Sequence, residues 1–186
     1  MSVKSSKRSS VESSAASTVH RFASPTVVIS NRQRIKKINL RLLRHITRAL
    51  LEELELGRVE LGITLVGAPE MTRLNETFLR HAGSTDVLAF NYGNAGRAGS
   101  PLPAAGAHGV PRPALHGEIF ICVNEALLQA RRFSTGWQSE IVRYLVHGIL
   151  HLLGFDDTNL RARRKMKLEE NRLLRRLSHR FSLAQL

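Results

Sequence analysis

Two histidines, a glycine and two aspartates in one short stretch have the spacing of a metal site. The stretch reads His147-Gly-Ile-Leu-His151-Leu-Leu-Gly154-Phe-Asp156-Asp157. Helical residues four apart lie one turn apart on the same face, so both imidazoles can reach one ion. Glycine commonly ends a helix in a left-handed conformation, after which the chain can return a carboxylate as third ligand. Three protein ligands beside an open coordination position are typical of a catalytic metal site.

The spacing favours Asp157 as the third ligand. Metzincin proteases place their third ligand ten residues after the first histidine, which corresponds to Asp157 here. Asp156 then either orients a ligand imidazole or replaces Asp157 in the ligand set. One divalent ion is expected, and zinc is the first choice. An aspartate in place of a third imidazole makes the site harder, so manganese or another divalent ion can compete.

The residue after the first histidine separates two kinds of hydrolysis. Metallopeptidases with this spacing place a glutamate there as general base, whereas this chain has Gly148. Phosphodiester cleavage depends less on that residue, because a bound ion both activates water and stabilises charge on phosphoryl oxygens. The alternative without a metal is that His147 and His151 are ordinary residues of an apolar helix; the aspartate pair that follows favours a metal site.

Composition is consistent with one soluble domain. The chain has 186 residues, 42% of them hydrophobic. No apolar run approaches the roughly 20 residues that span a bilayer. The single cysteine, Cys122, excludes an intrachain disulfide, predicts no disulfide-linked partner and lies in an apolar run, where a buried hydrophobic role is expected. A reducing compartment follows, and a cytoplasmic location is predicted.

Positive charge is concentrated after the metal motif. Of the net charge of +13, residues 161–186 contribute +7, from nine basic and two acidic residues. Such a field could hold a polyanion against the ion. It could equally be the solvated face of a helix, and the sequence leaves both interpretations open.

Periodicity and turn residues divide the chain into a tail, one domain and a short end. Residues 1–25 are basic and Ser-rich, which predicts a disordered tail or, less simply, an organelle transit peptide. Residues 91–116 are rich in Gly, Ala and Pro, which predicts a flexible insertion between two strands. The domain is predicted over 26–178, with a C-terminal tail at 179–186. The expected strands cover 26–30, 59–66, 85–90 and 118–123; the expected helices cover about 39–56, from 69 onward, 124–133, 137–153 and 160–178.

Three blocks resemble the YbeY family of bacterial rRNA-maturation endoribonucleases. The stretch His147–Asp157 is similar to the family signature H-G-x-L-H-L-x-G-[YF]-D-H. A second block, with Leu74-Asn75, Phe78 and the stretch 85–90, resembles L-N-x-x-Y-R…T-D-V-L-S-F. A third, residues 117–122, resembles G-D-I-x-I-C. Together they cover about residues 26–178.

The resemblance implies fold, activity and partners. The implied fold is α+β, a small mixed four-stranded sheet packed against helices, with the metal site on a central helix and the following loop. The implied activity is metal-dependent, single-strand-specific RNA endonuclease work on the 3′ end of small-subunit rRNA and in ribosome quality control. His147, His151 and Asp157 are then the catalytic and metal-binding residues. Implied partners are rRNA, the small ribosomal subunit and its assembly factors, with no membrane.

Two positions depart from the family pattern. Asp157 stands where the family has its third histidine, and Leu79 stands where it has an arginine after the aromatic residue. Arg80 is adjacent and is a candidate contact to RNA phosphate or a solvated surface residue. Glu170 either accepts a hydrogen bond from a ligand histidine or pairs on the surface, and Asp86 either lines the cleft or caps a turn.

Two other functions compete with RNA cleavage. The first is a ribosome-assembly factor that binds RNA without cutting it and has a structural or vestigial metal, which Asp157 and Leu79 favour. The second is a metallopeptidase, against which Gly148 argues.

Overall fold

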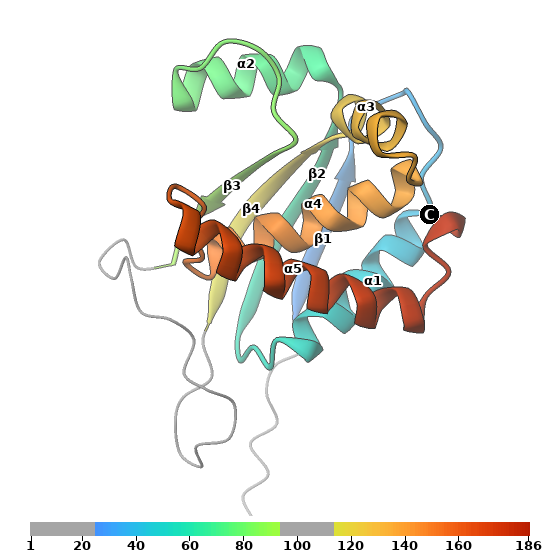
Figure 1. The fold of residues 1–186 in the computed structure, drawn as a ribbon, viewed down its shortest axis with the longest axis vertical. Coiled ribbons are helices and arrows are strands. Elements are labelled where there is room, and N and C mark those ends of the chain that lie inside the picture. The colour runs from blue at the N-terminus through green and yellow to red at the C-terminus, as the bar shows by residue number, and fades with distance from the viewer. Residues whose placement is uncertain (1–24, 94–113) are drawn as a thin grey trace, which may run out of the picture.

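A four-stranded mixed sheet forms the base of the domain (Figure 1). The computed structural model describes residues 25–93 and 114–186. Its strands are β1 (Thr26–Asn31), β2 (Val59–Val66), β3 (Val87–Asn91) and β4 (Leu115–Cys122), in the order β1-β2-β4-β3. β1, β2 and β4 run parallel, and β3 pairs antiparallel to β4 at one edge. The predicted mixed α+β sheet is confirmed.

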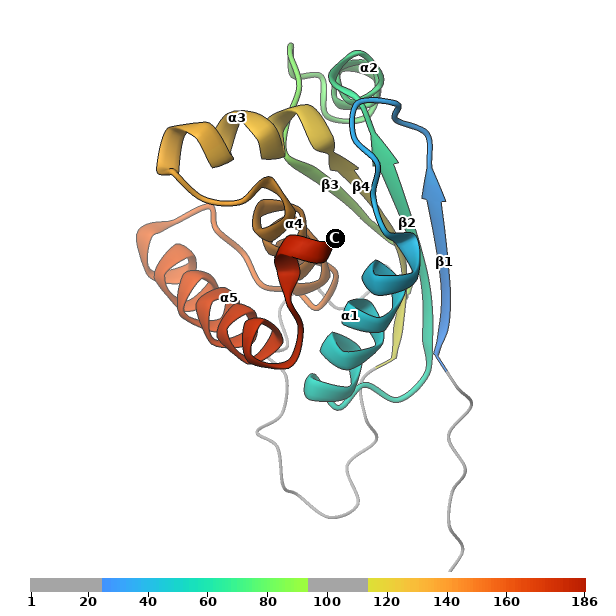
Figure 2. The ribbon, with the colours of Figure 1, turned by 90° about the vertical axis from the view of Figure 1, so that its right-hand side faces the viewer.

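Helices cover one face of the sheet in two layers. Figure 2 shows α1 and α4 next to the sheet and α5 outside them, while α2 lies at one end. The helices are α1 (Leu40–Glu53), α2 (Ala68–Leu79), α3 (Val123–Phe133), α4 (Trp137–Leu152), α5 (Leu160–Arg180) and a short 3-10 turn η1 (Leu183–Gln185). The central helix that carries the histidines is therefore held between the sheet and another helix.

The central helix α4 is apolar on nearly all sides, as a buried helix must be. Ile141, Leu145 and Ile149 are fully buried in the main core. Gly148 lets the helix approach the sheet closely, because a Cβ there would lie 2.9 Å from Cγ2 of Ile119 and 3.1 Å from a methyl of Val87. The side-chain direction at position 148 thus points into the sheet, so the position used as general base by metallopeptidases is occupied by packing here.

The observed elements follow the predicted ones, with two differences. β4 begins at Leu115, inside the predicted insertion, because its first residues pair with β2. The predicted C-terminal tail is wrong: α5 continues to Arg180, and Leu186 is 4% exposed and accepts a backbone hydrogen bond from Asn39. Burial of these last residues against α1 and α4 explains the correction. The predicted tail 1–25 and insertion 91–116 lie largely outside the described residues.

Cys122 is fully buried, as expected, and burial raises the pKa of its thiol. A buried thiol with a raised pKa is a poor nucleophile, so this residue has a packing role. Among the helices of the described ranges, none combines the length and apolarity that a membrane crossing requires.

Candidate metal centre

The two histidines of α4 converge on one point. Nε2 of His147 lies 3.0 Å from Nε2 of His151, and the two rings are nearly perpendicular at 85°. The carboxylate of Asp157 joins them, so that one ligand atom from each residue lies within 4.8 Å of the others. The side chains predicted from spacing to share an ion are therefore together in space.

Hydrogen bonds to the other ring nitrogens fix which atoms can bind an ion. Nδ1 of His147 lies 3.2 Å from Oε2 of Glu170, and Nδ1 of His151 lies 3.1 Å from the carbonyl oxygen of Phe155. Because both partners are acceptors, Nδ1 carries the hydrogen in each ring and Nε2 keeps its lone pair. Two lone pairs at 3.0 Å repel unless a cation lies between them. The donor set thus fits a divalent ion held by His147, His151 and Asp157, with each imidazole oriented from behind.

The loop after α4 returns Asp157 to the histidines. The backbone N–H of Phe155 donates to the carbonyl of Leu150, and that of Gly154 donates to the carbonyl of His151. Gly154 has φ +84°, a left-handed conformation that a glycine adopts without strain. From the sheet, the side-chain amide of Asn91 donates to the carbonyl of Leu152 and ties the helix end to β3.

Asp156 turns away from the metal group. Its carboxylate accepts hydrogen bonds from the backbone N–H and the hydroxyl of Thr158, at 3.0 and 2.6 Å, which also lower its pKa. It is exposed and stabilises the turn into α5. Of the two neighbouring aspartates, Asp157 is the one in the group that could hold an ion.

Charge states in the centre suit cation binding. Burial and the neighbouring His147 lower the pKa of His151, which favours the neutral form that can bind an ion. Burial alone would raise the pKa of Glu170, but hydrogen bonds from His147, Lys167 and Arg143 outweigh it and lower the value to about 2. Glu170 is 3% exposed, so the interpretation in which it supports a ligand histidine is the one the geometry favours.

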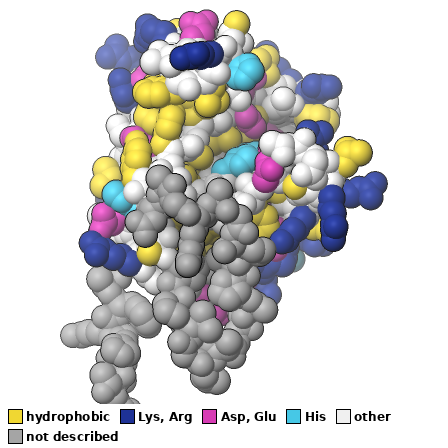
Figure 3. All heavy atoms as spheres, turned by 90° about the vertical axis from the view of Figure 1, so that its left-hand side faces the viewer, with side chains coloured by type: hydrophobic (Ala, Val, Ile, Leu, Met, Phe, Trp, Pro, Cys, Tyr) yellow, Lys and Arg dark blue, Asp and Glu magenta, His cyan; other side chains and the backbone are white. Residues whose placement is uncertain are grey.

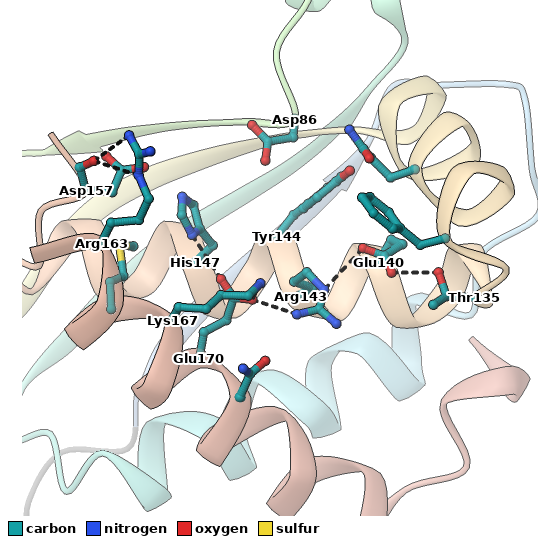
Figure 4. Close-up of a pocket in the computed structure, with 14 residues that line it drawn as sticks. Asp86, Thr135, Glu140, Arg143, Tyr144, His147, Asp157, Arg163, Lys167 and Glu170 are labelled. Carbon is teal, nitrogen blue, oxygen red and sulfur yellow. Dashed lines mark hydrogen bonds and ion pairs between the residues drawn. The ribbon is translucent and has the colours of Figure 1, made fainter. Parts of the chain in front are cut away.

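A cavity of about 570 Å³ opens beside the metal group and runs along α4 (Figure 4). His147, Asp157 and Asp86 line it, so Asp86 does reach the cleft. Asp86 also accepts hydrogen bonds from Thr85 and the backbone of Val87, so both interpretations of this residue hold. The other lining residues come from α3, α4, α5 and the turn before α4: Gln129, Phe133, Thr135, Glu140, Arg143, Tyr144, Arg163, Met166, Lys167, Glu170 and Asn171.

The structure separates residues that sequence reasoning found from those that it missed. Arg80 ends α2 in a left-handed conformation (φ 59°), is exposed and does not line the cavity, nor does Leu79. Its contact to phosphate stays a prediction. Arg163 was missed as a lining residue; its guanidinium donates to the carbonyl oxygen of Asp157 at 3.1 Å. Tyr144 was also missed, although its position three residues before His147 places it on the same helix face.

Comparisons with known proteins agree with this geometry. The family model described as Endoribonuclease YbeY matches residues 26–178. A protein named Endoribonuclease YbeY from Myxococcus xanthus is 39% identical over 72% of this chain, but the match spans only 42% of that protein. The protein of the same name from Elusimicrobium minutum is 35% identical over 62% of this chain and 72% of its own length. That from Salinibacter ruber is 30% identical over 75% and 83%.

A solved structure supports the fold. The solution structure of a Thermotoga maritima protein superimposes with a TM-score of 0.53 and 22% identity, covering 82% of this chain and 89% of that one. The family match extends over nearly all of the described residues and includes the converging His147, His151 and Asp157. The chain therefore belongs to the YbeY endoribonuclease family.

Proposed function

We propose that this protein is a metal-dependent endoribonuclease that cuts single-stranded RNA and acts on the 3′ end of small-subunit rRNA. The observation that carries the proposal is the convergence of two Nε2 atoms and one carboxylate beside an open cavity. The names of the family's members, all endoribonucleases, support RNA as the substrate.

The residues divide the work of such a reaction. His147, His151 and Asp157 would hold the ion, which supplies a water of lowered pKa and stabilises negative charge on a phosphoryl oxygen. Glu170 and the carbonyl of Phe155 keep the imidazoles in the tautomer that binds. Arg163, which lines the cavity next to Asp157, is placed to contact a phosphate oxygen. Zinc is the proposed ion, with manganese as the alternative that the carboxylate ligand allows.

The surface beside the centre suits a polyanion. Figure 3 shows histidine and acidic side chains together near the middle of this face, with lysine and arginine side chains gathered beside them. Arg161, Arg164 and Lys165 at the start of α5 are exposed and follow the Asp157 loop directly. Phosphate contacts from such residues supply affinity without selecting a sequence. The proposed partners are accordingly rRNA, the small ribosomal subunit and its assembly factors, in the cytoplasm.

The test combines metal analysis with an RNA assay. Protein purified without chelators should contain one equivalent of a divalent ion and cut single-stranded but not double-stranded RNA. His147→Ala and His151→Ala should each lose the ion and at least a thousandfold in kcat/KM, whereas Asp156→Ala should retain most of both. Full cleavage by either histidine variant would contradict the proposal, and addition of Zn²⁺ or Mn²⁺ to chelator-treated wild type identifies the effective ion.

A second candidate is a ribosome-assembly factor that binds RNA without cutting it. The carboxylate of Asp157 in place of an imidazole, and Leu79 in place of an arginine, favour it. This candidate predicts that His147→Ala still rescues a ribosome-maturation defect in cells that lack the protein. Failure of rescue by His147→Ala, together with rescue by Asp156→Ala, would leave the endoribonuclease as the better account.

A further inference from the structure

The cavity beside the metal group continues along α4 and ends at an exposed aromatic ring. His147 and Asp157 line one end, and Phe133, the last residue of α3, lines the other. His147 and Glu140 both line the cavity and stand seven positions apart on α4, a rise of about 10 Å along the helix. Phe133 is 62% exposed. This depth is about the reach of one nucleotide beyond a phosphate at the metal group.

A buried hydroxyl without a partner lies between the two ends. Tyr144 is 4% exposed and lines the cavity, and its hydroxyl makes no hydrogen bond to any residue in the described part of the chain. Figure 4 shows Tyr144 projecting from α4 on the same side as His147, toward the start of β3 where Asp86 lies. Leaving such a group unpaired is destabilising, so a ligand atom that accepts its hydrogen bond would bind with a gain. Burial and the charge of Asp86 raise its pKa, which keeps the hydroxyl a donor.

The charges in this half of the cavity suit a neutral group rather than a second phosphate. Arg143 bonds to both buried carboxylates, to Glu140 at 3.2 Å and to Glu170 at 2.7 Å. Lys167 also pairs with Glu170, at 2.6 Å. The cations are therefore occupied by carboxylates, and Asp86 adds a further negative charge. Phosphate has no surplus positive charge to bind here, whereas an uncharged aromatic ring meets no penalty.

We propose that this half of the cavity, defined by Phe133, Tyr144 and Gln129, binds the nucleobase adjoining the phosphodiester that is cut. The base stacks on the ring of Phe133, and its edge accepts a hydrogen bond from Tyr144 and pairs with the amide of Gln129, which lines the same region. Base–aromatic stacking tolerates any sequence because every base has a π face. A base in a duplex is already stacked and paired, so only single-stranded RNA can fill the pocket. The proposal rests on the proposed function, since it assumes that RNA enters the cavity.

The test uses a single-stranded oligoribonucleotide with one mapped cleavage position, and versions in which the nucleotide on either side is abasic. Wild type should lose roughly tenfold in kcat/KM with one of the two abasic substrates, the loss expected from a missing stacking partner. Phe133→Ala should lose a similar factor with the intact substrate and show no further loss with the abasic one, as in a double-mutant cycle. Tyr144→Phe should behave likewise with a smaller factor.

A matched control exists on the same helix. Leu128 lies on α3, is 55% exposed and does not line the cavity. Leu128→Ala should therefore match wild type with every substrate. If Phe133→Ala and Tyr144→Phe still discriminate between intact and abasic RNA as wild type does, the nucleobase pocket is wrong.

Binding measurements separate this proposal from the proposed function. The same oligonucleotides are titrated into chelator-treated protein, and binding is followed by fluorescence anisotropy. Binding that weakens with an abasic nucleotide in wild type but not in Phe133→Ala, without any cleavage by the metal-loaded protein, would support the pocket and overturn the nuclease. Cleavage with no effect of Phe133 in either assay would do the reverse. A protein that neither binds nor cuts these RNAs overturns both.

Discussion

The two halves of α5 carry similar positive charge and use it differently. In the C-terminal half, 171–180, Arg172 and Arg176 pair with Glu53 of α1, and Arg180 pairs with Glu52. In the N-terminal half, 160–169, three basic residues make no ion pair within the described part of the chain: Arg161, Arg164 and Lys165. One run of charge therefore joins two helices at one end and leaves cations unpaired at the other, beside the metal group.

The position of acidic partners decides between the two roles. α1 presents Glu52 and Glu53 to the second half of α5, so arginines there are used in packing. The first half faces the loop that carries Asp157, and Arg163 reaches only a backbone carbonyl there. A basic run is thus structural where carboxylates face it and available to a polyanion where they do not. The two interpretations that the sequence left open apply to different halves of one helix.

Glu170 lies at the middle of α5, where the halves meet, and its removal should have the largest effect. Glu170→Ala leaves the Arg143 guanidinium and the Lys167 ammonium without this partner and should cost about 3–5 kcal/mol in free energy of unfolding. It should also weaken metal binding roughly 10–100-fold, because Nδ1 of His147 loses its acceptor. Urea unfolding and a competitive metal titration measure the two effects.

The neighbouring Glu169 is the control. It is half-buried and pairs with Arg172, but it has no contact with a metal-group histidine. Glu169→Ala should reduce stability by only about 1 kcal/mol and leave metal affinity unchanged. Equal loss of metal affinity in the two variants would show that Glu170 does not act through His147.

Acid should remove the same stabilisation in wild type. The pKa of Glu170 is lowered from 4.5 to about 2 in the folded protein, so its ionised form stabilises the fold above pH 4.5. As pH falls from 4.5 toward 2, this contribution, up to about 3 kcal/mol, is lost because the unfolded chain binds the proton first. Urea unfolding of chelator-treated protein at stepped pH measures it. In Glu170→Gln this part of the pH dependence should disappear; an unchanged slope would contradict the assignment.

Neutralising the unpaired cations should weaken RNA binding without changing stability. If Arg161, Arg164 and Lys165 each contact a phosphate, changing all three to Gln should lower the slope of log K against log salt by about 2. At 0.1 M salt that corresponds to roughly a hundredfold loss of affinity for single-stranded RNA. The thermal midpoint should stay within about 1–2 °C, since no described contact is removed.

A variant with the same net charge controls for general electrostatics. Arg34, Lys37 and Arg41 are exposed and make no ion pair in the described ranges. They lie around the start of α1, on the opposite side of the molecule from the start of α5 (Figure 1). Changing these three to Gln should lower the salt slope much less. If both triple variants lose affinity equally, binding depends on net charge alone and the distinction between the halves of α5 fails.

The sequence predicted what depends on local pattern. The bounds of β2, the left-handed turn at Gly154 and the shared face of His147 and His151 all follow from periodicity and residue type, and the structure has them. Pairings between distant segments could not be predicted this way. The bond from His147 to Glu170 spans 23 positions and that from Arg172 to Glu53 spans 119, so each depends on how helices pack.

The same limit explains the other misses. Whether Arg80 reaches the cleft depends on the end of α2, where a left-handed residue redirects the chain. The last residues read as a tail because they are few and short of apolar pattern. Only the surface offered by α1 and α4 buries Leu186.

The C-terminal half of α5 should show the smallest effects, graded by exposure and by number of bonds. Arg172 bonds to Glu53 and to Glu169, and these bonds raise its pKa; Arg180 makes one bond, at 3.3 Å, between largely exposed side chains. Arg172→Gln should cost about 1 kcal/mol in urea unfolding, and Arg180→Gln about 0.2 kcal/mol or nothing. Neither should alter the salt slope of RNA binding by as much as one α5 residue that contacts phosphate. A large slope change in Arg172→Gln would mean that RNA reaches the α1 contact, so that pairing with α1 does not remove this half of the helix from the binding surface.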